Sequence, residues 1–192
     1  MTPKKVLLTA ATDADWQQVF NIRYGKGKFV KIKTWQDFKK FLLLSYAQEN
    51  AVMNRLRSLY PNSSLSFTDP DRDYLIIGPS GTCNRYDIER IDEKGNLTRI
   101  EVKNCKMCQK NNPYIIFNEH WKLPWSYTPL DISKVEKNYW EGRLHSADLI
   151  YFVDEACSEF CICNIQNGQY HASVGPYGNV VFLFDHYSWH TL

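Results

Sequence analysis

The pattern of apolar and polar residues first predicts a long helix. Between residues 34 and 60 the apolar side chains recur at the spacing of one helical face. Thr34 is a suitable N-cap, and Asp37, three residues later, is placed to complete a capping box. Pro61 follows the last apolar residue and cannot continue a helix. We therefore predict a helix over residues 34–60.

Shorter apolar and alternating runs follow, and these predict strands. Residues 62–72 are polar and are expected to form a turn region. The predicted strands cover residues 73–78, 85–92, 97–104, 148–153, 160–165 and 180–184, and a second helix is predicted over residues 131–144. The last strand is expected to close the sheet. This order predicts an α/β fold, one domain built on a mixed sheet.

Residues 85–104 read as a β-hairpin with its turn at residues 93–95. Gly95 can supply the left-handed backbone conformation that three-residue hairpin loops commonly need. If Asp92 faces Asn96 across the turn, the register of the whole hairpin is fixed.

That register brings candidate catalytic side chains together. It places Asp87 opposite Glu101, side by side on one face of the sheet. Glu101 and Lys103 share this face because they are two residues apart, whereas Val102 between them points the other way. Two carboxylates and the Val102 carbonyl are oxygen ligands of the kind that Mg²⁺ prefers. Lys103 could orient a water molecule or stabilise charge on a phosphate. The alternative is an exposed hairpin with cross-strand ion pairs.

Glu49 is an unexpected residue on the predicted helix. It falls on the apolar stripe or at its edge. Burying an unpaired charge is costly, so this acid needs a partner. A salt bridge or a boundary position would explain it, and so would an acid directed at a metal ion or a lysine.

Asp87, followed after a short hairpin by Ile100-Glu-Val-Lys103, resembles the PD-(D/E)xK nuclease superfamily. The resemblance implies a restriction-endonuclease-like mixed β-sheet flanked by helices. The family core has a helix, a three-stranded meander, a second helix and a further strand, which is the order predicted here. We expect a single nuclease-like domain over residues 1–192, with a core at about residues 34–165 and elaborations at both ends.

The same resemblance implies roles for individual residues. Asp87 and Glu101 would bind Mg²⁺, for which Mn²⁺ can substitute, Lys103 would serve the attacking water, and Glu49 would be an auxiliary acid. The chain departs from the family pattern at Tyr86, where the family has a proline before the aspartate.

Another aspartate could take the place of Asp87. Asp71 follows Pro70, as in the family's dipeptide, and Asp73 follows soon after. Both leave a longer gap to Glu101, so we favour Asp87, which the hairpin places directly opposite it.

The cysteines offer a second metal hypothesis. Cys105 and Cys108 have the C-x₂-C spacing of a zinc knuckle, and Cys161 and Cys163 lie on a later predicted strand. These four thiolates could close a structural Zn²⁺ site. Because alternate residues of a strand share one face, packing of buried thiols explains the later pair equally well. We favour packing over zinc.

Composition and charge narrow the class of protein only slightly. The chain has 192 residues, 44% of them hydrophobic and 23% charged, which suits one globular domain. A net charge of +2 does not identify a partner. The sequence shows no secretory signal and no stretch of membrane-spanning length, so we expect no membrane partner and a cytoplasmic location with reduced cysteines.

Two segments are candidates for nucleic-acid contacts. One is a basic stretch predicted to be a turn entering a strand, and the other is an aromatic loop; their residues are Lys26, Lys28, Lys31, Lys33, Trp121 and Lys122. A solvated basic face is the favoured alternative for the first. A loop pinned to the core by its tryptophans is an equal alternative for the second.

The sequence thus predicts an Mg²⁺-dependent nuclease that hydrolyses DNA phosphodiester bonds. We expect an endonuclease of restriction or mobile-element type that acts on double-stranded DNA, with a homodimer as the simplest way to cut both strands. The alternatives are a non-catalytic nucleic-acid-binding or interaction protein with the same fold and a Cys-bound zinc, and an RNA-directed nuclease.

Overall fold

The computed structural model describes residues 3–24, 32–78, 86–105, 114–116, 147–164, 170–174, 180–184 and 187–192, with the backbone alone for 114–116, 170–174 and 180–184. Its elements are β1 (Lys4–Leu7), α1 (Asp13–Tyr24), α2 (Trp35–Leu59), β2 (Ser64–Phe67), β3 (Tyr74–Ile77), β4 (Ile88–Ile91), β5 (Leu97–Cys105), β6 (Tyr114–Ile116), β7 (Leu149–Asp154), β8 (Glu159–Asn164), β9 (Tyr170–Val174), β10 (Val180–Phe184) and β11 (Trp189–Thr191).

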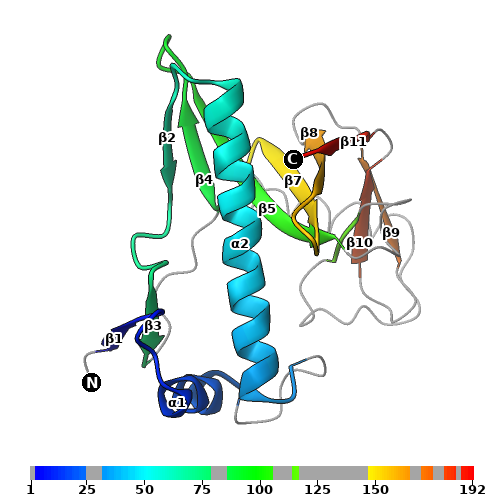
Figure 1. Ribbon diagram of the computed structural model, residues 1–192. Helices are drawn as coiled ribbons and strands as arrows, with labels where there is room; N and C mark the ends of the chain where they lie inside the picture. Colours follow the sequence, from blue (N-terminus) through cyan, green and yellow to red (C-terminus); the bar gives the residue numbers. More distant parts are fainter. Residues whose placement is uncertain are drawn as a thin grey trace.

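The protein is a mixed α/β fold organised around one larger sheet. Six strands form this sheet in the order β11-β8-β7-β5-β4-β2, and α2 runs along it (Figure 1). Strands β5 and β7 are parallel, whereas all other neighbours in the sheet are antiparallel. The sheet is therefore mixed, as predicted.

The main core lies between α2 and this sheet. Its buried side chains come from the second half of α2 and from alternate residues of the strands: Val52, Met53, Leu56, Ile88, Ile100, Val102, Tyr151, Val153 and Phe160. Since neighbouring residues in a strand point to opposite faces, Glu101 and Lys103 project from the face of β5 that α2 does not cover.

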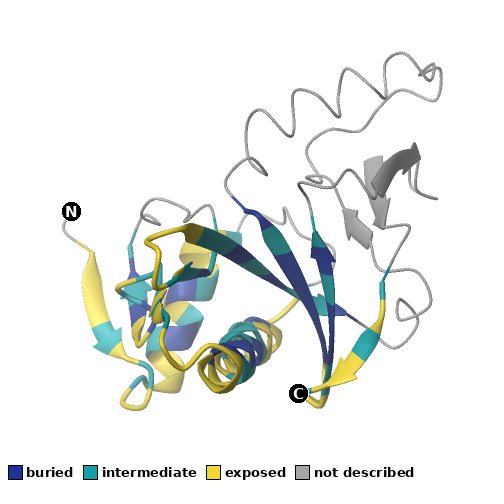
Figure 2. Cartoon of the chain, turned by 90° about the horizontal axis from the view of Figure 1, so that it is seen from above, coloured by how far each residue is buried: buried dark blue, intermediate teal, exposed yellow. Residues whose placement is uncertain are grey.

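A second, smaller core lies at the N-terminal end of the protein. It combines α1, the β1–β3 sheet and the first turns of α2, and its buried residues are Trp16, Val19, Phe38, Leu75 and Ile77. Figure 2 shows buried residues gathered on the sides of α1 and α2 that face their neighbours. Helix α2 thus contributes to both cores.

The boundaries of α2 confirm the predicted helix. Asp37 N–H donates to Thr34 Oγ1 at 3.1 Å, and Thr34 N–H donates to Asp37 Oδ2 at 3.0 Å. This reciprocal pair satisfies two backbone donors that the first turn of a helix leaves without partners. The helix ends at Leu59, one residue before the predicted end.

From Ile88 to its turn the hairpin also has the predicted register. At Asp87 the pairing departs from it, because the Asp87 N–H donates to Ile100 rather than to Glu101, the residue predicted opposite it. Ile88 pairs with Ile100, and Asp92 N–H donates to the carbonyl of Asn96 at 3.1 Å. Gly95 adopts a φ of 82°, in the left-handed region that glycine tolerates best. The turn therefore fixes the pairing that the sequence indicated.

The prediction for residues 62–78 was wrong in two respects. Residues 62–72 are not only a turn, because they contain β2, which pairs with β4 and forms an edge of the main sheet. Strand β3 exists as predicted over 73–78, but it pairs with β1 in a separate two-stranded sheet. The two serines of β2 made the segment look like a polar turn. Its two apolar residues, Leu65 and Phe67, pack against the main core.

The prediction for residues 180–184 was wrong in its placement. The strand forms, but it pairs with β6 and β9 in a three-stranded sheet, and β11 takes the edge position beside β8. Short apolar strands carry no information about their partner, so the sequence did not separate these sheets. Strands 148–153 and 160–165 correspond to β7 and β8, while the predicted helix 131–144 lies outside the described residues.

Polar side chains hold β5 against β7 at both ends. Near the carboxyl ends of the strands, buried Gln48 donates to Asn104 Oδ1 at 3.0 Å and to the carbonyl of Val153 at 3.1 Å. Near their amino ends, Asp148 accepts from the backbone N–H of Arg99 at 2.7 Å and from its guanidinium at 2.9 Å. Between these contacts β5 carries Glu101 and Lys103.

Candidate active site

Asp87 lies where β4 begins and where β5 continues past it. Its backbone N–H donates to the carbonyl of Ile100 at 2.9 Å, and its carbonyl accepts from the N–H of Thr68 at 3.0 Å. Its carboxylate accepts from the N–H of Val102 at 2.7 Å. The side chain thus takes a backbone donor of β5 just before the pairing with β4 begins, and this contact holds it against the E-x-K segment.

The predicted pair of Glu101 and Lys103 is present on the neighbouring strand. The ammonium of Lys103 forms an ion pair with Oε1 of Glu101. The Glu101 side chain is 16% exposed and that of Lys103 is 42% exposed. The pair therefore lies at the boundary between the sheet and solvent, where a substrate could reach it.

The electrostatics of Asp87 tie it to this pair. Burial, and next the negative charge of Glu101, raise the pKa of Asp87 to about 6, against the opposing effects of the Lys103 charge and the Val102 N–H. A carboxylate whose pKa is raised by a neighbouring carboxylate is stabilised in its charged form by a nearby cation. The structure therefore brings Asp87, Glu101 and Lys103 together, as the sequence predicted.

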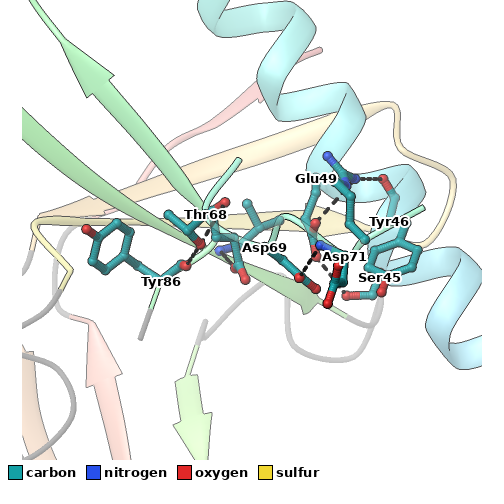
Figure 3. A network of polar contacts seen from close by, with 10 residues as sticks. Ser45, Tyr46, Glu49, Thr68, Asp69, Asp71 and Tyr86 are labelled. Atoms are coloured by element: carbon teal, nitrogen blue, oxygen red, sulfur yellow. Dashed lines mark hydrogen bonds and ion pairs between the residues drawn. The ribbon is translucent and has the colours of Figure 1, made fainter. Parts of the chain in front are cut away.

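Glu49 projects from α2 toward the loop that follows β2 (Figure 3). Its side chain is 12% exposed, accepts a hydrogen bond from Ser45 Oγ at 3.3 Å, and lies 3.3 Å from Nη2 of Arg72. Burial, and next the charge of Asp87, raise the pKa of Glu49 to about 7. The charge of Asp87 therefore acts on Glu49, but the residue in contact with Glu49 is Arg72.

Sequence reasoning missed Arg72 and Asp69. Arg72 is only 8% exposed, and the charge of Asp69 contributes to the raised pKa of both Glu49 and Tyr46. Both lie in the segment interpreted as a polar turn. The one available signal was Pro70, which drew attention to the residue after it instead.

The alternative acids do not join the site. Asp71 pairs with the ammonium of Lys5 at 2.7 Å, and its N–H donates to Asp69 Oδ1 at 2.9 Å. Asp73 is exposed, and its carbonyl accepts from Leu8 N–H at 2.9 Å.

Three of the described cysteines lie on strands of the main sheet, Cys105 on β5 and Cys161 and Cys163 on β8. Cys105, Cys161 and Cys163 are buried, and the sulfur atoms of the last two lie 3.9 Å apart. The contact with Cys161, together with burial, raises the pKa of the Cys163 thiol far above its usual range. This arrangement agrees with packed neutral thiols. Cys108, the fourth predicted zinc ligand, lies outside the described residues.

The oxygen donors suit a hard cation. No group of three or more carboxylate, imidazole or thiol side chains in the described part of the chain converges on a ready metal site. Mg²⁺ does not require one, because it commonly binds through one or two carboxylates and keeps several waters. Asp87 and Glu101 could serve as two such carboxylates, and a bound cation would relieve the repulsion between their charges.

The residues predicted to contact nucleic acid fall almost entirely outside the described part of the chain. Lys26, Lys28, Lys31, Trp121 and Lys122 lie outside the described residues. Lys33 lies in no strand but directly before the helix cap, where its N–H donates to Asp37 Oδ2 at 3.3 Å.

Comparison with known proteins gives no relative from which a role could be transferred. No protein-family model, curated protein or solved structure matches the chain significantly. No helix among the described residues is long and apolar enough to cross a membrane. The functional argument therefore rests on the geometry of the site.

Proposed function

We propose that this protein is an Mg²⁺-dependent nuclease that hydrolyses DNA phosphodiester bonds, with Asp87, Glu101 and Lys103 as its catalytic centre. The observation that carries the proposal is the hydrogen bond from Val102 N–H to the Asp87 carboxylate. It fixes an acid beside a second acid and a lysine on a partly exposed face of the sheet.

The fold supports the same proposal. A helix (α2) precedes three strands that pair antiparallel in the order β2, β4 and β5, and β7 then pairs in parallel with β5. Strand β3, in the separate two-stranded sheet, intervenes between β2 and β4 in the chain. This is the order that the resemblance to PD-(D/E)xK nucleases implies for the described elements, with β2 in place of the strand first expected. A restriction-endonuclease-like architecture is therefore part of the proposal.

Each side chain has a role that its surroundings support. Asp87 and Glu101 would hold the Mg²⁺, which when bound polarises a phosphoryl oxygen and activates water. The Val102 carbonyl is a third candidate ligand, next to the N–H that orients Asp87. Lys103 is exposed enough to meet a phosphate, and its charge would oppose the negative charge that develops there.

The proposal is tested by incubating purified protein with supercoiled plasmid and Mg²⁺ or Mn²⁺. We expect nicking or linearisation by the wild type. Asp87→Asn and Lys103→Met should each lower the rate by about 100-fold or more, as expected for removal of a group that stabilises developing charge. Glu93→Gln and Lys94→Met are matched controls, because both residues are exposed in the turn of the same hairpin.

The outcomes separate the proposal from its alternatives. Undiminished cleavage by both catalytic variants, or none by the wild type with either ion, would contradict it. Binding of DNA without cleavage would favour the non-catalytic nucleic-acid-binding protein. Faster cleavage of an RNA of matched sequence would favour an RNA-directed nuclease, and sedimentation with and without duplex DNA tests the homodimer.

A further inference from the structure

Arg72 is an arginine that the proposed chemistry does not use. Its guanidinium lies 3.3 Å from the centre of the Phe67 ring and 5.4 Å from that of Tyr46. Nη2 lies 3.3 Å from Glu49 Oε2 and 3.4 Å from the carbonyl of Tyr46. Figure 3 shows how Glu49 and Tyr46, both on α2, face the loop after β2 from which Arg72 comes. The guanidinium is therefore held in place by rings and oxygens together.

One hydrogen-bond donor of this guanidinium is left without an acceptor in the described part of the chain. Nη1 of Arg72 is buried and has no hydrogen-bond partner among the described residues. A buried donor without an acceptor costs free energy, and an arginine cannot remove that cost by losing its proton. The positive charge of Arg72 is therefore permanent at this buried position.

The surroundings of Arg72 carry several negative charges. The charges of Asp69 and Asp87 both act on Glu49, and the charge of Glu101 acts in turn on Asp87. Among the described residues no three of these carboxylates converge on one cation. Phe67, on which the Arg72 guanidinium stacks, pairs with Ile88 beside Asp87, and the charges of Lys103 and Arg72 both lower the pKa of Asp87. Lys103 is tied to Glu101 at the solvent side, so Arg72 is the cation on the buried side.

We propose that Arg72 is a built-in counter-cation that neutralises Glu49, so that Glu49 acts as a positioning residue for Arg72 and the site takes a single divalent cation at Asp87 and Glu101. This inference rests on the proposed function and refines it. The resemblance makes Glu49 an auxiliary acid beside the metal. In this inference Glu49 instead holds the guanidinium of Arg72, which is the second positive charge of the site. The pair as a whole is neutral toward the bound metal ion.

The consequence is a characteristic pattern of cation affinities. Removing Arg72 alone leaves Glu49 uncompensated and should attract a divalent cation more strongly. Removing the charge of Glu49 alone exposes the bound cation to Arg72 and should weaken binding. Removing both restores a neutral pair, so binding should return close to that of the wild type. The two changes should therefore be strongly non-additive.

The experiment is a titration of full-length protein with Mn²⁺ in mildly alkaline buffer, followed by calorimetry. We expect one Mn²⁺ per wild-type chain, and at least about fivefold tighter binding by Arg72→Met, the size of effect expected from a unit charge in a partly solvated site. Glu49→Gln should bind more weakly by a similar factor, and the double variant should lie within about threefold of the wild type. Arg72→Lys keeps the charge and should bind no more tightly than the wild type.

Two controls keep the test decisive. Asp87→Asn should abolish binding, which marks the level expected for the loss of a direct ligand. Far-ultraviolet circular dichroism checks that each variant folds; if Arg72→Met does not, Arg72→Gln, which keeps a planar group over Phe67, replaces it in the cycle. A double variant that binds as weakly as Asp87→Asn would make Glu49 a direct ligand and overturn the inference, as would Arg72→Met binding no tighter than the wild type.

Plasmid cleavage by the same preparations separates this inference from the function on which it rests. Cleavage by the wild type with the wrong order of affinities overturns only the role of Arg72. The expected order of affinities without cleavage overturns the nuclease proposal and leaves the role of Arg72 standing. A wild type that neither binds Mn²⁺ nor cleaves DNA overturns both.

Discussion

At the scale of single residues, the candidate site contains two acids, Asp87 and Glu49, whose charged forms are destabilised by burial in the folded protein. The pKa of Asp87 is raised to about 6 and that of Glu49 to about 7, in both cases first by burial and then by a neighbouring carboxylate. Raised pKa values of this kind mean that the folded state binds protons more tightly than the unfolded state. Carboxylates with raised pKa values cluster at functional sites, although ion-pair networks shift pKa values too.

These pKa values predict how stability depends on pH. Because both groups have raised pKa values when folded, the metal-free protein should lose stability as pH rises from about 4 through about 7. We expect these two acids to contribute a loss of about 3–5 kcal/mol between pH 5 and pH 8, since one pKa unit corresponds to about 1.4 kcal/mol. Urea unfolding in the presence of EDTA at these two pH values measures it.

The variants identify the source of this pH dependence. Glu49→Gln and Asp87→Asn should each reduce the difference in unfolding free energy between the two pH values. Glu93→Gln, at an exposed site, should leave it unchanged. A pH dependence that is the same in all four proteins would contradict the assignment. Mn²⁺ should restore stability at pH 8 in the wild type more than in Asp87→Asn.

Single residues also show where sequence reasoning succeeds. Asp87, Glu101 and Lys103 could be predicted because one hairpin brings them together, so their spacing along the chain already describes the contact. The position of Arg72 could not be predicted, because Arg72 reaches Glu49 from the loop that follows β2 in the chain. Nothing in a local pattern distinguishes an arginine that is stacked and buried from one that lies in water.

At the scale of elements, the hairpin of β4 and β5 is the part of the fold most fully contained in its own sequence. Asp92 accepts backbone hydrogen bonds from Lys94 at 2.9 Å and Asn96 at 2.8 Å. Gly95 N–H donates to the Asp92 carbonyl at 2.9 Å. These contacts are all local, which explains why the turn and the register could be read from residue types.

Gly95 provides a test of this local control. A Cβ at this position would meet nothing within 4 Å, so the cost of Gly95→Ala should come from the positive φ alone. We expect the variant to lose about 1 kcal/mol of unfolding free energy. Asparagine tolerates the left-handed region better, so Gly95→Asn should lose less.

Urea unfolding of the three proteins measures these differences. Equal losses for alanine and asparagine would show that something other than backbone conformation limits this turn. A loss well above the expected value for alanine would show that the side chain has displaced a neighbour, in contradiction to the open space around Gly95.

The strands that were misplaced show the limit of the same approach. Strand β2 carries two serines and two apolar residues, and only its pairing with β4 turns that short alternation into part of a sheet. Strands β3 and β10 were recognised as strands, but their partners β1, β6 and β9 are chosen by contacts across the molecule. Local pattern fixes the type of an element more readily than its neighbour.

At the scale of the whole molecule, α2 joins the two cores and carries Glu49 between them. Phe38, near its start, is buried in the N-terminal core, and Val52 and Leu56 are buried in the main core. Glu49 lies between these positions on the same helix, and Arg72 comes from the loop that connects β2 in one sheet with β3 in the other. The Glu49–Arg72 pair therefore links the two sheets at the candidate site.

This arrangement predicts that the two cores unfold together. Leu75→Ala removes buried side-chain volume from the N-terminal core and should cost about 2–5 kcal/mol. Because α2 is continuous through both cores, the N-terminal core cannot open without freeing the first turns of the helix and breaking the contact between Glu49 and Arg72. The loss of stability should therefore appear in both sheets.

Native-state hydrogen exchange measures this coupling residue by residue. In Leu75→Ala, we expect the slowest amides of β3 and those of β5 and β7 to lose the same free energy of exchange, equal to the loss measured by urea unfolding. Leu97→Ala, at a half-exposed position of the main sheet, is the control and should change both sheets little. If protection is lost in β1 and β3 alone, the small sheet opens independently. Arg72 would then be free to leave Glu49 without unfolding of the main core, and the counter-charge at the site would be a movable one rather than a fixed one.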